Sequence, residues 1–73
     1  MPLENVEVPI TGKVLRVEVE VGSKVEEGAV LCIIESMKME NPILATVAGQ
    51  VQEISVTPGQ QVKSGQVLAV IEY

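Results

Sequence analysis

Hydrophobic side chains occupy every second position of residues 13–21 from Leu15 onward, and charged side chains fill the positions between them. The apolar members of this segment are Leu15, Val17, Val19 and Val21. A period of two is typical of a strand that packs one face on a core and turns the other to solvent. The pattern therefore predicts a strand over residues 13–21.

Two continuous apolar runs, at residues 30–34 and 67–71, interrupt the alternation later in the chain. Runs of this length predict strands that are buried on both sides or that cross the middle of a sandwich. No window shows the apolar spacing of a helix, and glycine or proline interrupts the chain at short intervals. We expect an all-β fold.

The chain contains an internal repeat, because residues 12–35 align without a gap on residues 49–72. The identical positions are Gly12/Gly49, Val14/Val51, Val19/Val56, Gly22/Gly59, Val25/Val62, Gly28/Gly65, Val30/Val67, Leu31/Leu68, Ile34/Ile71 and Glu35/Glu72. Others exchange one β-branched residue for another, so the repeat conserves the side chains that pack on a pleated surface. The repeat predicts a sandwich or flattened barrel with quasi-two-fold symmetry, formed by residues 1–73 as a single domain.

The repeat also predicts local features that occur twice. The spacing of the shared valine and isoleucine positions breaks strict alternation near residues 15–16 and again near residues 52–53, which indicates a bulge in both halves. Gly22 and Gly59 each follow a strand pattern and supply the positive φ that a tight turn needs. Matching turns are expected at both places.

Composition and charge exclude several partners. The chain has ten acidic residues, all of them Glu, against five Lys or Arg, and its net charge of −5 argues against nucleic acid and anionic membranes. Its apolar runs are too short for membrane insertion. The one cysteine, Cys32, cannot form an internal disulfide, and its apolar surroundings predict a small buried side chain. A reducing, cytoplasmic location is expected.

Lys38 is the candidate functional residue, because it stands between two thioethers, Met37 and Met39, just after the first copy of the repeat. Residues 36–40 are all that remains to connect the flanking strands, which places Lys38 at the apex of a tight hairpin. Turns favour Gly, Asn, Asp or Ser, so folding does not explain two methionines there. Exposed methionines beside one amine indicate an adaptable surface that a modifying enzyme recognises.

Glu35 and Glu40 flank the same hairpin. Their simplest interpretation is that acidic residues at strand ends keep the hairpin soluble and protect its edges from pairing. Recognition by the modifying enzyme is the second interpretation.

Residues 30–43, together with residues 8–12 and 45–49, resemble the biotinyl domain family. This family comprises the biotin carboxyl carrier modules of biotin-dependent carboxylases, decarboxylases and transcarboxylases. The resemblance implies a barrel-sandwich hybrid of two four-stranded antiparallel sheets, with biotin joined through an amide to Lys38. It also implies a biotin protein ligase that recognises Met37, Met39, Glu35 and Glu40, and a biotin that carries carboxylate between a biotin carboxylase and a carboxyltransferase.

Three features depart from the family pattern. Ser36 stands where Ala is usual, and Thr46 replaces a common Pro. The gapless repeat also leaves no room for the protruding thumb that acetyl-CoA carboxylase carriers of the common bacterial type insert in the first half. The chain therefore resembles the thumbless modules of pyruvate, propionyl-CoA or methylcrotonyl-CoA carboxylases, of oxaloacetate decarboxylases and of transcarboxylases.

The available side chains favour a carrier over an enzyme. With no His, no Asp and one Cys, the chain cannot assemble a nucleophile with its base or a thiolate metal site. Attachment of biotin to Lys38 therefore needs a separate ligase that supplies activated biotin.

Two other interpretations remain open. A lipoyl domain shares the fold and the lysine hairpin but usually has other residues beside the lysine, so Met37 and Met39 argue against it; a protein that accepts either cofactor is a variant of this reading. A cofactor-free barrel-sandwich module of a membrane-transport adaptor is the third interpretation, and it gives Lys38 no role.

Overall fold

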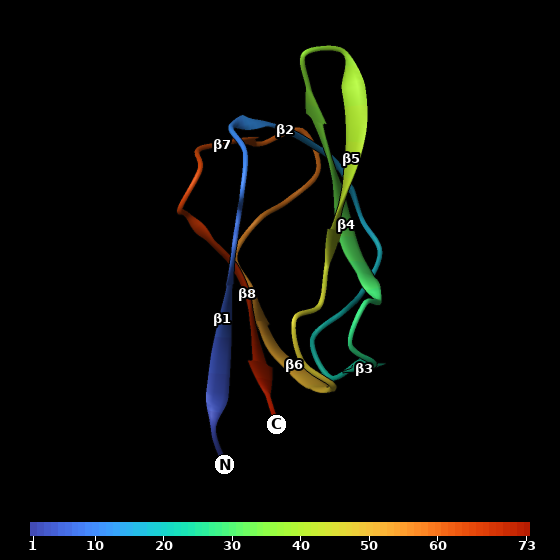
Figure 1. Cartoon of the computed structure of the whole chain (residues 1–73), viewed down its shortest axis with the longest axis vertical. Coiled ribbons are helices and arrows are strands. Elements are labelled where there is room, and N and C mark those ends of the chain that lie inside the picture. Colours follow the sequence, from blue (N-terminus) through green and yellow to red (C-terminus); the bar gives the residue numbers. More distant parts are fainter.

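Every regular element of the computed structural model, which describes all of residues 1–73, is a β-strand. The eight strands are β1 (Leu3–Glu7), β2 (Gly12–Val17), β3 (Lys24–Val25), β4 (Val30–Ser36), β5 (Met39–Leu44), β6 (Gly49–Ile54), β7 (Gln61–Val62) and β8 (Val67–Glu72). They form two four-stranded antiparallel sheets with the orders β1-β8-β6-β3 and β5-β4-β2-β7 (Figure 1). The predicted all-β sandwich is confirmed.

The two sheets correspond strand by strand under the offset of the repeat. β6 of one sheet matches β2 of the other, β8 matches β4, β3 matches β7 and β1 matches β5. Each sheet therefore combines strands from both halves of the chain, since β3 pairs with β6 and β7 pairs with β2. The predicted quasi-two-fold symmetry is present, and neither half completes a sheet by itself.

A core of 15 buried residues lies between the sheets: Val6, Val8, Val14, Val25, Leu31, Cys32, Ile34, Ile43, Ala45, Val51, Val56, Val62, Leu68, Ala69 and Ile71. Most of these are β-branched or leucine side chains, which pack well on a pleated surface. Ile33 and Val70 are also buried but lie outside this cluster, on the strands β4 and β8 in the middle of each sheet. Residues 31–34 and 68–71 are therefore buried on both faces of their strands, as predicted, whereas Val30 at the start of the first run is exposed.

The two predicted bulges are confirmed. The register of β2 against β4 shifts between Val14 and Arg16, and the register of β6 against β8 shifts between Val51 and Glu53. An extra residue on one strand increases the local twist, which helps a small sheet to curl around its core. The predicted turns are present as well, with φ of 95° at Gly22 and 89° at Gly59.

The strand predicted over residues 13–21 is too long, because β2 ends at Val17. Beyond it the Glu18 amide still donates to the Leu31 carbonyl, and the chain then crosses to the other sheet, where the Gly22 amide donates to the Val51 carbonyl. Val19 packs against the core during this crossing. Apolar and polar residues thus continue to alternate after β2 has ended, where the chain pairs with no neighbouring strand. Alternation alone does not distinguish a paired strand from an unpaired extended segment.

The molecule is elongated, with extents of 36 × 18 × 17 Å. The β4–β5 hairpin forms one end of the long axis, and both termini lie at the opposite end (Figure 1). The quasi-two-fold symmetry accounts for this arrangement. β8 and β1 occupy the places in their sheet that β4 and β5 occupy in the other sheet, but no turn joins β8 to β1. The hairpin therefore lies at the end of the molecule farthest from both termini.

Candidate functional site

The Lys38 hairpin is tighter than predicted. Ser36 and Met39 are paired at the ends of β4 and β5, so Met37 and Lys38 alone make the turn in place of the predicted connection over residues 36–40. Met37 has φ of 54° and Lys38 has φ of 63°. Positive φ at both central residues is the requirement of a type I′ turn, whose twist matches that of the flanking strands. Lys38 lies at the apex, as predicted.

The turn holds two side chains in a conformation that they rarely adopt. Met37 and Lys38 are the only residues other than glycine with positive φ. A left-handed conformation costs about 1 kcal/mol or more for such a residue, and type I′ turns normally use Asn or Gly for that reason. This conformational cost falls in the turn that carries the exposed Met37 and Lys38. Local strain of this kind is typical of functional segments.

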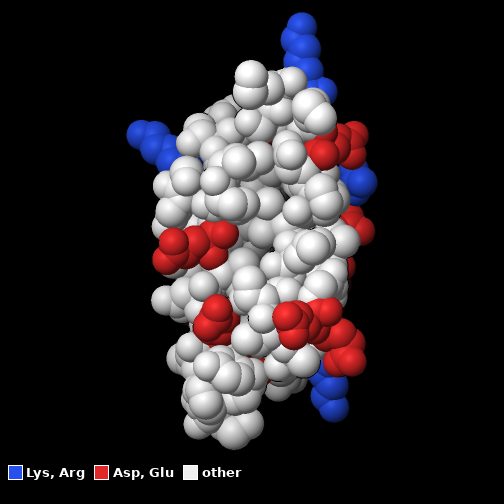
Figure 2. Space-filling view, in the orientation of Figure 1, with Lys and Arg blue, Asp and Glu red and all other residues white.

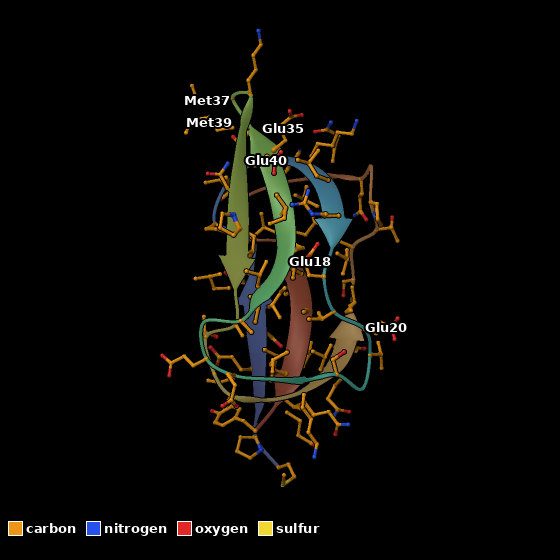
Figure 3. All side chains as sticks on the ribbon, turned by 90° about the vertical axis from the view of Figure 1, so that its right-hand side faces the viewer. Glu18, Glu20, Glu35, Met37, Met39 and Glu40 are labelled. Carbon is orange, nitrogen blue, oxygen red and sulfur yellow. The ribbon has the colours of Figure 1, made fainter.

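The methionine side chains are free of the core. Met37 is 92% exposed and Met39 is 67% exposed. They lie on one side of the hairpin tip, whereas Glu35 and Glu40 lie on the other (Figure 3). The predicted exposed thioether surface is therefore present, and it adjoins the exposed Lys38.

Glu35 and Glu40 face one another across β4 and β5. Like charges directly opposite on a sheet repel, so the arrangement weakens the hairpin slightly. Arg16 partly offsets this repulsion, because its guanidinium lies 3.7 Å from Glu40 Oε1 and 3.0 Å from Glu18 Oε1. Lys38 takes part in no ion pair. Figure 2 shows a basic side chain projecting from the hairpin end of the molecule, with acidic side chains along the flanks.

Asn41 belongs to the same hairpin but is not among the site residues predicted from the sequence. Its side-chain amide donates to the carbonyl of Met39 at 3.0 Å and to that of Ile34 at 3.3 Å. A signal for it exists in the repeat, because the corresponding position in the second strand pair is Glu4. The shared fold accepts an amide at one of these two positions and a carboxylate at the other. The amide of Asn41 therefore serves the lysine hairpin and not the shared fold.

No other candidate binding site lies near the hairpin. The one surface hollow is lined by residues of β3 and of both chain ends, among them Met1, Lys24 and Tyr73. β3 and both chain ends lie at the end of the molecule opposite the hairpin (Figure 1). Cys32 is buried as predicted, and burial raises the pKa of its thiol to about 11. The chain forms no helix long and apolar enough to cross a membrane.

A protein-family model matches most of this chain. Residues 4–71 match the model described as "Biotin-requiring enzyme". The matched region includes the whole Lys38 hairpin and all eight strands except Leu3, the first residue of β1, and Glu72, the last residue of β8.

Curated relatives include the gamma subunit of glutaconyl-CoA decarboxylase from Acidaminococcus fermentans, 52% identical over 40 residues, which are 55% of this chain and 28% of that subunit. The propionyl-CoA carboxylase alpha chain of Ruegeria pomeroyi is 54% identical over 37 residues, 51% of this chain and 5% of the relative. The biotinylated protein TB7.3 homolog of Mycobacterium leprae is 49% identical over 45 residues, 62% of this chain and 63% of that protein. The matches thus cover small parts of the first two relatives.

Solved structures agree with the sequence comparison. A region of the Kluyveromyces lactis urea carboxylase superposes on 99% of this chain with a TM-score of 0.92 and 35% identity, and it makes up 6% of that chain. A single-chain, multi-domain long-chain acyl-CoA carboxylase gives a TM-score of 0.88 and 32% identity over 93% of this chain and 7% of its own. The chain belongs to the biotin-requiring enzyme family, as a non-catalytic biotin carrier domain.

Proposed function

We propose that residues 1–73 form one biotinyl domain in which Lys38 carries biotin on its side-chain amine. The observation that carries the proposal is the position of this amine, in a two-residue turn at the far end of an elongated barrel, between two exposed methionines. An amide formed there would project the cofactor into solvent, away from the core and from both chain ends.

Biotin on Lys38 would carry carboxylate between a biotin carboxylase and a carboxyltransferase, each supplied by another domain or subunit of a thumbless type of enzyme. The names of the relatives support this role, since they include carboxylases and a decarboxylase subunit. The barrel contributes a rigid base, and the flexible lysine stem provides the reach. A free, buried thiol at Cys32 agrees with a reducing cytoplasmic location.

A biotin protein ligase would attach the cofactor, with Met37 and Met39 as its contact surface. Glu35 and Glu40 lie on the opposite side of the tip, where they would form a second, weaker contact (Figure 3). The ligase would also supply the groups that activate the amine, because Lys38 forms no ion pair within this chain.

Carboxyl transfer tests the carrier role. The biotinylated chain, incubated with a biotin carboxylase, ATP and isotopically labelled bicarbonate, should acquire labelled carboxylate, and adding a carboxyltransferase with its acceptor should remove it. The unbiotinylated chain is the control and should remain unlabelled. A biotinylated chain that never acquires the label would contradict the proposal.

Replacing Met37 by Asn should separate recognition from stability. Asn tolerates a left-handed turn better than Met, so the free energy of unfolding should stay the same or rise by about 0.5 kcal/mol. The loss of an exposed thioether should nevertheless lower the kcat/KM of the ligase. Chemical denaturation and initial labelling rates measure the two effects. Destabilisation by more than about 1 kcal/mol would show instead that Met37 packs in the folded hairpin.

A further inference from the structure

Asn41 makes every side-chain hydrogen bond of the hairpin. Its Nδ2 atom lies 3.0 Å from the Met39 carbonyl on its own strand and 3.3 Å from the Ile34 carbonyl on β4. No other side chain of residues 34–44 donates or accepts a hydrogen bond. The amide therefore bridges the two strands just below the turn.

Apart from the backbone pairing of β4 with β5 and the exposed Arg16–Glu40 ion pair, few contacts stabilise the tip. Met37 and Met39 are exposed, Met37 and Lys38 are strained, and Glu35 faces Glu40 across the strands. β5 is an edge strand, so only β4 pairs with it. Segments with few buried contacts open locally at low free energy, so the hairpin end should open more readily than the barrel.

The repeat provides an internal comparison. Glu4 on β1 occupies the position of Asn41 on β5, and its carboxylate accepts a hydrogen bond from the Thr46 hydroxyl at 3.1 Å. Both strands are edge strands of equivalent sheets. The scaffold therefore folds with a carboxylate at this position, and the bridging amide occurs only in the copy that ends in the lysine turn.

We propose that Asn41 is a positioning residue for the modification of Lys38. Its amide keeps the end of the hairpin closed, so that the lysine and its two methionines are presented to the ligase in one arrangement. When a ligase binds only the closed hairpin, its apparent affinity is its intrinsic affinity multiplied by the fraction of hairpins that are closed. The inference rests on the proposed function, because it assigns Asn41 a part in biotin attachment.

Two variants test the proposal, Asn41→Ala and Asn41→Asp. Both remove the donor, and only the second adds a charge. Each should lower the kcat/KM for ligase-catalysed biotinylation about threefold, mainly through a higher KM, the loss expected where one lost hydrogen bond turns a mostly closed hairpin into a mostly open one. Amide hydrogen exchange in residues 36–41 should accelerate by a similar factor, whereas exchange in the core strands and the Tm should stay close to those of the wild type.

Gln50→Ala is the matched control, because Gln50 also donates its side-chain amide to a backbone carbonyl, that of Gly22 at 3.1 Å. It lies beside the hollow at the other end of the molecule and should change neither labelling nor hairpin exchange. Unchanged labelling of Asn41→Ala, with the wild type labelled normally, would overturn the inference alone. A fall in Tm that accounts for the lost labelling would also overturn it, and a wild type that is not labelled would overturn the proposed function as well.

Discussion

Replacing Lys38 by Arg should abolish biotin incorporation and leave the thermal unfolding of the chain unchanged. Arginine keeps the positive charge but offers the ligase no amine to acylate. Lys38 is exposed and forms no ion pair, so the substitution should change the free energy of unfolding by no more than about 0.5 kcal/mol. Incorporation of labelled biotin and the Tm are the two measurements.

Lys13→Arg serves as the control for this experiment. Lys13 lies on β2, paired in register with Glu35, and it has no flanking methionine. Its replacement should leave biotin incorporation at the level of the wild type. Residual labelling of Lys38→Arg, or loss of labelling in Lys13→Arg, would place the attachment site elsewhere.

Replacing Leu31 by Ala should destabilise the domain by about 2–5 kcal/mol, the range for leucine-to-alanine cavities in a packed core. Leu31 is fully buried between the sheets, and its symmetry partner Leu68 is 2% exposed. For a small domain such a loss is a large fraction of a total stability of about 5–15 kcal/mol. Urea denaturation followed by a spectroscopic probe of strand content measures the change.

Leu44→Ala is the matched control, because Leu44 lies on the adjacent strand β5 and is 45% exposed. The same atoms are deleted there without leaving a closed cavity, so the loss should stay below about 1 kcal/mol. Equal destabilisation by the two substitutions would mean that the apolar run of β4 is not the centre of the core.

The fold was largely predictable because the repeat constrains it twice. Each identity between residues 12–35 and residues 49–72 supports the same strand, bulge or turn in both halves, and the structure confirms those features. The end of β2 was not predictable in the same way. Val19 faces the core while the chain crosses between the sheets, so hydrophobicity continues after pairing has stopped.

At the hairpin, the chemistry was easier to predict than the geometry. The exposure of Met37 and Met39 was predicted from their place in the short connection between two strands, and it is confirmed. The two-residue turn was missed because its positive φ angles fall on Met37 and Lys38. Turn propensities favour Gly, Asn or Asp at such positions and predict neither Met nor Lys there. Asn41 was missed because Asn41 and Glu4 lie outside the aligned residues 12–35 and 49–72, and because its two acceptors are backbone carbonyls.

Peptide mapping of the wild-type chain, after reaction with a biotin protein ligase and biotin, tests the central claim most directly. We expect one biotinyl group per chain, found on the peptide that contains Lys38, with Lys13, Lys24 and Lys63 unmodified. Biotin on any of those three lysines, or a Lys38 that a lipoate ligase modifies while the biotin ligase leaves it free, would contradict it.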